Sequence, residues 1–194
     1  MRKLFLLFIV VLLAACAKPA PLPPTHAIDV SWRYDQVAPN FHLTDFTGKP
    51  RQLSDFRGKV VVLFFGFTHC PEICPTTMSD LSRALKQLGA DADKVQVLFI
   101  TIDPERDTAD VLAKYVPYFN PSFIGLRGDA QATADAAKVF AVSYEKHEEK
   151  NGGYTMDHTD SQYLVGKDGR TVLMSPYGQR TDWLVGDLRV LLNQ

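Results

Sequence analysis

The chain has 194 residues, of which 46% are hydrophobic and 22% are charged, and its formal net charge is −1. This length and composition predict one globular domain with additional segments. The balanced charge, without a run of lysine or arginine, excludes the basic surface that nucleic-acid-binding proteins need. We therefore expect no nucleic-acid partner.

The N-terminal segment has the pattern of a signal peptide. Met1-Arg2-Lys3 precede an apolar run from Leu4 to Ala15, which is too short to span about 30 Å of hydrocarbon as a helix. An uncleaved membrane anchor is the alternative. LAAC, residues 13–16, resembles a bacterial lipobox, so residues 1–15 are predicted to be a lipoprotein signal peptide and Cys16 the lipidated residue. The protein is then expected on the extracytoplasmic (periplasmic) side, attached to the membrane by its lipid.

Residues 16–36 are predicted to be a lipidated tether. They contain Pro19, Pro21, Pro23 and Pro24, and prolines favour an extended chain that would hold the domain away from the membrane. The folded domain is expected to begin near residue 37 and to continue to residue 194.

The hydrophobic pattern of residues 37–194 predicts strands alternating with helices. The nearly continuous apolar runs at 59–67 and 94–103 are typical of strands buried on both faces of a parallel sheet. Strands are expected at 41–56 (a hairpin), 59–67, 94–103, 123–128 and 161–174 (a second hairpin), and helices at 76–90, 107–119, 129–142 and 181–194. This order predicts an α/β fold, a thioredoxin-like three-layer α/β/α sandwich with an N-terminal β-hairpin.

The stretch GFTHCPEICPTT, residues 66–77, holds a cysteine pair directly after the first buried strand. Three residues separate Cys70 from Cys74, whereas thiol redox motifs and zinc half-sites usually have two. Pro75 suits the first helical position, so Cys74 is expected at a helix N-terminus, where the helix dipole favours a thiolate. One helical turn would place the two Cα atoms about 6 Å apart, which permits either a disulfide or a shared metal ion.

Three interpretations compete for this pair. A purely structural disulfide would close a loop too short to stabilise the fold by much. Structural zinc needs two further ligands, and the histidines are scattered singly along the chain. Two thiolates with one imidazole form a soft donor set that selects Cu(I), while the nitrogen ligand also tolerates Cu(II). The candidates for the imidazole are His26, His42, His69, His147 and His158.

His158 is the strongest of these candidates. It lies just before the strand expected at 161–165, and in a thioredoxin-like fold that loop reaches the cysteine site. Redox thioredoxins carry a cis-proline there, whereas this chain has no proline between Pro121 and Pro176. A surface histidine is the alternative interpretation. His69 ranks second, because neighbouring residues on a coiling segment point apart.

Two aspartates are candidates for supporting roles around the site. Asp157 is expected to orient the imidazole of His158, as metal-bound histidines commonly require. Asp103 ends the second buried strand and is expected to act electrostatically on the site, or to lead into the following helix.

Three separated motifs, FTHCPEICPTTM, TIDPERDT and MDHTDSQYLV, resemble the SCO/SenC family of copper-binding proteins over roughly residues 37–192. Members assist assembly of the copper centre of cytochrome c oxidase. The resemblance implies a thioredoxin fold, copper bound by Cys70, Cys74 and His158, and attachment to a membrane by a helix or a lipid. Met156 departs from the family pattern, in which valine is common, and is interpreted as packing or as an additional soft contact.

The favoured function is that of a metallochaperone that passes copper to an extracytoplasmic acceptor. The expected partners are the copper-accepting subunit of a terminal oxidase and another periplasmic copper chaperone. The alternative is a thiol-disulfide oxidoreductase that reduces the cysteines of the acceptor with the same pair. A peroxiredoxin-like peroxidase is disfavoured, because Phe67 stands three residues before Cys70, where those enzymes have threonine or serine.

Overall fold

The computed structural model describes residues 23–194, apart from residues 36, 151 and 171. The predicted signal peptide (1–15) and Cys16 lie outside the described residues. In the described part of the chain, no helix has the length and apolar character needed to cross a membrane.

The centre of the fold is a mixed sheet of eight strands. Strands β4, β5 and β6 are parallel, and every other neighbouring pair is antiparallel. The spatial order β1-β10-β9-β4-β5-β6-β2-β3 is built from β1 (Ile28–Asp29), β2 (Leu43–Asp45), β3 (Pro50–Arg51), β4 (Val60–Gly66), β5 (Val95–Thr101), β6 (Ile124–Arg127), β9 (Gln162–Val165) and β10 (Val172–Ser175). All residues of β4 and β5 are buried, as their continuous apolar runs predict.

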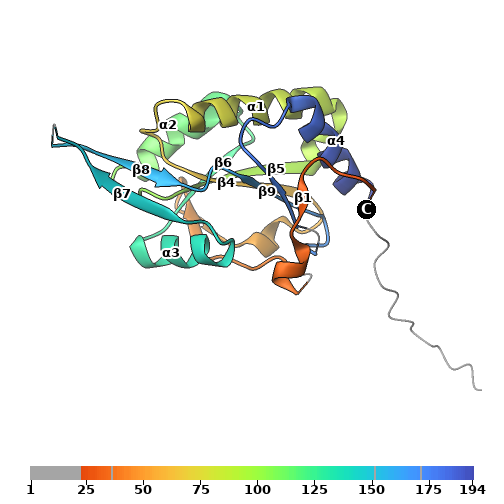
Figure 1. The fold of residues 1–194 in the computed structure, drawn as a ribbon, viewed down its shortest axis with the longest axis horizontal. Coiled ribbons are helices and arrows are strands. Elements are labelled where there is room, and N and C mark those ends of the chain that lie inside the picture. Colours follow the sequence, from red (N-terminus) through yellow and green to blue (C-terminus); the bar gives the residue numbers. More distant parts are fainter. Residues whose placement is uncertain (1–22, 36, 151, 171) are drawn as a thin grey trace, which may run out of the picture.

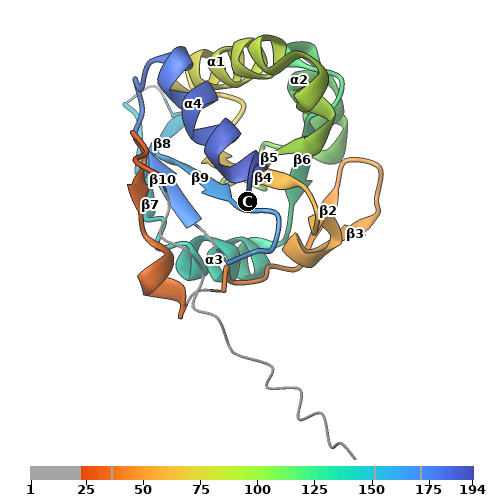
Figure 2. The same cartoon turned by 90° about the vertical axis from the view of Figure 1, so that its right-hand side faces the viewer.

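Helices cover both faces of this sheet. They are α1 (Ile73–Leu88), α2 (Ala109–Phe119), α3 (Ala130–Val139) and α4 (Thr181–Leu192). Figures 1 and 2 show α1, α2 and α4 on one face and α3 on the other. The predicted three-layer α/β fold is therefore confirmed.

Both predicted hairpins are present, although the first is short. Strands β2 and β3 pair with Leu43 opposite Arg51, and the turn between them uses the positive φ of Gly48. The remainder of that predicted hairpin, Leu53–Phe56, is a 3₁₀ helix. In the second hairpin, β9 and β10 pair with Val165 opposite Val172.

The packed part of the chain begins before residue 37, where the tether was expected to end. Ala27 and Val30 are buried, and β1 pairs with β10. The physical reason is Asp187 on α4, whose buried carboxylate accepts the backbone N–H groups of His26 and Ala27, both at 2.8 Å. A buried carboxylate requires such donors, so the segment is held against the domain.

A further hairpin was not predicted. Strands β7 (Tyr144–Glu148) and β8 (Tyr154–His158) form a separate two-stranded sheet that projects from the side of the molecule in Figure 1. Its exposed, charged residues lack the apolar alternation that indicates a strand. This hairpin carries His158 as its last residue.

Candidate metal centre

The two cysteines lie at the carboxyl edge of the parallel strands, where α/β sheets usually hold their functional groups. After β4 the chain turns through residues 67–72 into α1. Cys70 lies in this turn and is half-buried, whereas Cys74 is the second residue of α1 and is fully buried. The helix therefore begins before the position that Pro75 suggested. Both cysteines are free thiols.

The helix N-terminus acts on Cys70 rather than on Cys74. The backbone N–H of Cys74 donates to the Cys70 Sγ atom at 3.3 Å. The pKa of Cys70 is lowered, chiefly because the Cys74 thiol donates to its sulfur and also because backbone N–H groups donate to it; these contacts outweigh its partial burial. Hydrogen bonding to Cys70 and burial raise the pKa of Cys74. Cys74 does lie in the first turn of the helix, as expected, but the directions of the two pKa shifts favour the thiolate on Cys70 rather than on Cys74.

His158 reaches the cysteines from 84 residues away in the chain. Its Nε2 atom lies 3.7 Å from Cys74 Sγ, and its Nδ1 atom lies 2.8 Å from the carbonyl oxygen of Thr159. Because a carbonyl only accepts, Nδ1 carries the proton and the lone pair of Nε2 faces the sulfur. Phe64 and Phe67 contact the imidazole edge to face, with ring centroids 6.3 and 6.0 Å away.

This spacing fits a shared metal ion. Typical metal–thiolate and metal–imidazole bonds are about 2.3 and 2.0 Å, so a trigonal ion bound to both would separate the sulfur and nitrogen by about 3.7 Å. In residues 23–194 as described, no three His, Cys, Asp or Glu side chains already converge on one metal position. Binding by Cys70, Cys74 and His158 together therefore requires their side chains to move closer to one another.

The structure corrects the prediction about Asp157 and, of the two roles expected for Asp103, agrees with the one that leads into the next helix, since the Asp103 carbonyl accepts the Asp107 N–H at 2.9 Å. Asp157 does not orient His158: its side chain is 79% exposed and pairs with His147 Nε2 at 3.0 Å. Adjacent strand residues point to opposite sides, so Asp157 turns outward where His158 turns inward. The orienting acceptor is the Thr159 carbonyl. The buried carboxylate of Asp103 accepts from Arg106 and from the Tyr154 hydroxyl, so it supports the hairpin rather than the sulfurs.

Asp107 is the acidic residue that the sequence interpretation missed. The helix expected at 107–119 would begin at this residue, but the N-cap of α2 is Thr108, whose side chain accepts from the Val111 N–H. Asp107 is fully buried and accepts from the Thr68 N–H at 3.0 Å, the Thr68 hydroxyl at 2.6 Å and the Thr101 hydroxyl at 2.6 Å. It therefore fixes the start of the turn that carries Cys70.

His26, His69 and His147 have other partners than the cysteine pair. His69 is exposed and approaches Asp107 at 3.9 Å. His26 stacks on Trp183, and His147 pairs with Asp157. Met156 is buried and lines a cavity of about 360 Å³ beside the hairpin, together with Tyr154, which agrees with the packing interpretation.

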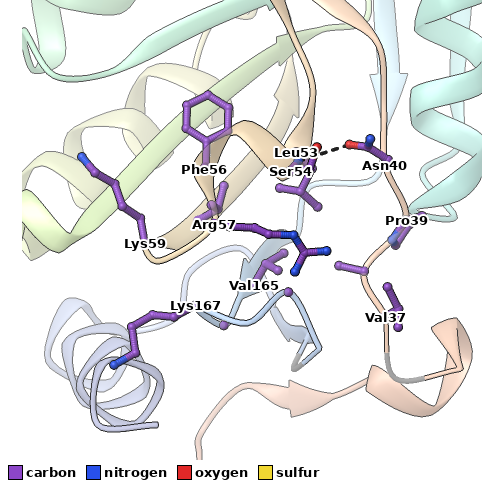
Figure 3. A pocket seen from close by; sticks show the side chains of 14 residues that line it. Val37, Pro39, Asn40, Leu53, Ser54, Phe56, Arg57, Lys59, Val165 and Lys167 are labelled. Carbon is purple, nitrogen blue, oxygen red and sulfur yellow. Dashed lines mark hydrogen bonds between the residues drawn. The ribbon is translucent and has the colours of Figure 1, made fainter.

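A second cavity, of about 290 Å³, lies at the opposite end of β4 from the cysteines and includes Val61 and Val165 in its walls. Figure 3 shows Arg57 extending across it toward Val37 and Pro39. The chemistry-bearing side chains are therefore at one end of the sheet and this cavity at the other.

Comparison with known proteins agrees with this geometry. The family model described as SCO1/SenC matches residues 32–193. The mitochondrial SCO2 homolog of Bos taurus is 42% identical over 133 residues, which are 67% of this chain and 50% of that protein. The chain thus spans about half the length of these curated relatives.

Two solved structures share the fold. Bradyrhizobium japonicum ScoI with copper bound is 39% identical with a TM-score of 0.74, over 80% of this chain and 99% of that one. Apo Sco1 from Thermus thermophilus is 44% identical with a TM-score of 0.72, over 79% of this chain and 90% of that one. With the family model covering most of the described domain, the chain belongs to the SCO1/SenC family.

Proposed function

We propose that this protein binds copper through Cys70, Cys74 and His158 and delivers it to an extracytoplasmic acceptor, the copper centre of cytochrome c oxidase, during assembly. The observation that carries the proposal is the pairing of His158 Nε2 with Cys74 Sγ at 3.7 Å, with Nδ1 held by the Thr159 carbonyl. An imidazole oriented in this way has its free lone pair ready for a metal.

The chemistry of the donors favours copper as the cargo. Thiolates are soft ligands that select Cu(I), and imidazole also accepts Cu(II), so the same three side chains serve both oxidation states. The lowered pKa of Cys70 supplies one thiolate without a metal, and the second proton leaves when the ion binds. The copper-bound relative from Bradyrhizobium japonicum supports this choice of metal.

The cellular setting follows from the N-terminal pattern. We propose that Cys16 is lipidated and holds the domain at the extracytoplasmic side of the membrane. The partners would be a copper-accepting oxidase subunit and a periplasmic copper donor. A radiolabelled acyl precursor should label the wild-type chain but not Cys16→Ala. Equal labelling of the two chains would rule out the anchor.

Copper binding tests the main proposal. The full chain, reduced and kept in detergent, should bind Cu(II) with a sulfur-to-copper charge-transfer band and Cu(I) with one ion per chain. His158→Ala should weaken Cu(II) binding and shift the band, whereas His69→Ala should leave both unchanged. An unchanged band in His158→Ala would remove His158 from the ligand set.

The cysteine pair also favours a second candidate function, the reduction of the disulfide in the copper acceptor. The half-buried Cys70 thiolate would attack that disulfide and form a mixed disulfide, which Cys74 would resolve. Two electrons pass to the acceptor, which leaves as a dithiol, and Cys70–Cys74 becomes the disulfide. The test measures the reduction of a disulfide peptide derived from the acceptor. Reduction that continues in His158→Ala would favour this reaction, whereas no reduction by the wild-type chain would favour copper delivery.

A further inference from the structure

The position of His158 depends on a hairpin that the main sheet does not hold. Strands β7 and β8 form their own two-stranded sheet, and His158 pairs with Tyr144 at its base. There, Thr159 and Ser143 exchange hydrogen bonds, with the Thr159 N–H donating to the Ser143 carbonyl at 2.9 Å. An isolated hairpin is marginally stable, so a further attachment must fix its angle to the cysteines.

That attachment centres on Tyr154, at the start of β8. Arg106 donates from Nη1 to the Tyr154 carbonyl at 2.8 Å, and its Cζ atom lies 3.6 Å from the centroid of the Tyr154 ring. The Tyr154 hydroxyl donates to Asp103 Oδ1 at 2.8 Å. We call Asp103, Arg106 and Tyr154 the hairpin clamp.

The clamp is anchored in the sheet. Asp103 is buried two residues after β5, its N–H donates to the Thr101 hydroxyl at 3.0 Å, and its carboxylate pairs with Arg106. Arg106 also lies over the ring of Phe67, with Cζ 5.8 Å from the centroid, and Phe67 contacts the imidazole of His158. One guanidinium therefore touches both the strand that carries His158 and the ring that packs against it.

A second cation reinforces the same tyrosine. Lys146 Nζ lies 3.9 Å from the Tyr154 ring centroid and 3.1 Å from Glu105 Oε2. Two cations this close to one centroid cannot share a face, so the ring lies between Arg106 and Lys146. Cation–π contacts of this kind favour a fixed ring position.

We propose that Arg106 and Tyr154 are positioning residues for the copper site: the hairpin clamp holds β8 so that His158 faces the two sulfurs. The inference rests on the proposed function. With the clamp intact, the third donor is in place before copper arrives. With the clamp broken, the hairpin swings and copper meets the two cysteines alone.

The test measures Cu(II) binding by the full chain in detergent, with the charge-transfer band and the nitrogen hyperfine splitting in electron paramagnetic resonance as readouts. Arg106→Gln should lower the affinity by about 10- to 100-fold, the usual loss for a residue that orients a ligand, and should weaken the nitrogen splitting. Tyr154→Phe should have a smaller effect, since the Arg106 contact to the backbone carbonyl remains. The matched controls are Arg83→Gln and Tyr118→Phe, on exposed side chains of α1 and α2.

Two readouts separate positioning from a general loss of structure. Added imidazole should restore the nitrogen splitting both in Arg106→Gln and in His158→Ala, because the cysteines remain in place. In the His158→Ala background, Arg106→Gln should cause no further loss of affinity, since the clamp acts only through His158. If Arg106→Gln does not fold, Tyr154→Phe carries the same double-mutant comparison.

A wild-type affinity and spectrum in Arg106→Gln, or losses that add to those of His158→Ala, would overturn the inference. Failure of the proposed function is a different result: the wild-type chain would then bind no copper, or His158→Ala would behave as wild type.

Discussion

Gly66, the last residue of β4, lies so close to Cys74 that a β-carbon at position 66 would stand 2.8 Å from the Cys74 Sγ atom. The same β-carbon would lie 3.1 Å from the ring of Phe99 and 3.2 Å from the ring of Phe64. All three neighbours are fully buried, so none can move aside freely. The absence of a side chain at this position therefore gives the buried sulfur its place.

We accordingly expect Gly66→Ala to displace Cys74 and to damage the metal site. Overpacking of a buried region costs about 1–3 kcal/mol, and the copper affinity should fall as well, because the sulfur leaves its position beside His158. Gly186→Ala is the matched control: the same change on α4 meets nothing within 4 Å and should leave stability equal or slightly higher. Denaturant melts and Cu(I) competition titrations measure the two effects. Equal behaviour of the two variants would contradict the expectation.

The thiol chemistry should depend on pH in a way set by the lowered pKa of Cys70. An ordinary cysteine is mostly protonated below about pH 8, whereas Cys70 keeps its thiolate as the pH falls, until the lowered pKa is reached. Iodoacetamide should therefore label Cys70 at pH 5–6 and label Cys74 only after unfolding, since Cys74 is buried and its pKa is raised. Peptide mass spectrometry distinguishes the sites.

Cys74→Ala provides the control for that experiment. It removes the thiol that donates to Cys70, so labelling of Cys70 at pH 5–6 should slow and recover near pH 8. If Cys74 were labelled first in the folded wild-type chain, the assignment of the thiolate to Cys70 would be wrong.

Asp157 should be dispensable for copper binding, despite its position next to His158. Its carboxylate is 79% exposed and pairs with His147 on the outer side of the hairpin, and exposed pairs contribute about 0–1 kcal/mol. Asp157→Asn should leave the copper affinity within about twofold of wild type, because surface substitutions of this kind usually change a free energy by less than about 0.5 kcal/mol. A tenfold loss would show that Asp157 does act on the imidazole.

The error over Asp157 shows what the sequence can and cannot predict. The apolar runs of β4 and β5 and the periodicity of α1 indicate the central layers, and the cysteine pair between them locates the site. The residues of β8 do not show the apolar alternation of a strand, so the sequence does not predict one there. Without a predicted strand, the alternation that turns His158 inward and Asp157 outward cannot be inferred. The early start of the fold depends on Asp187, 160 positions from Ala27, and no local pattern indicates a contact of that range.

Asp107 allows the turn before the cysteines to be tested by itself. Its carboxylate receives three donors: the N–H and hydroxyl of Thr68 and the hydroxyl of Thr101. Asp107→Ala leaves these three donors without an acceptor, which should cost at least about 3 kcal/mol, because each unsatisfied buried donor costs about 1–3 kcal/mol. Copper should also dissociate faster, since Thr68 no longer fixes the turn that carries Cys70.

Asp107→Asn separates hydrogen bonding from charge in the same place. Its amide oxygen can accept from the Thr68 N–H and the Thr101 hydroxyl, and its amide nitrogen can donate to the Thr68 hydroxyl, which rotates freely. Stability should therefore fall by less than half as much as in Asp107→Ala. Denaturant unfolding and stopped-flow transfer of Cu(I) to a chelator measure the two variants side by side. Equal destabilisation by both would mean that the negative charge, rather than the three accepted hydrogen bonds, holds the turn.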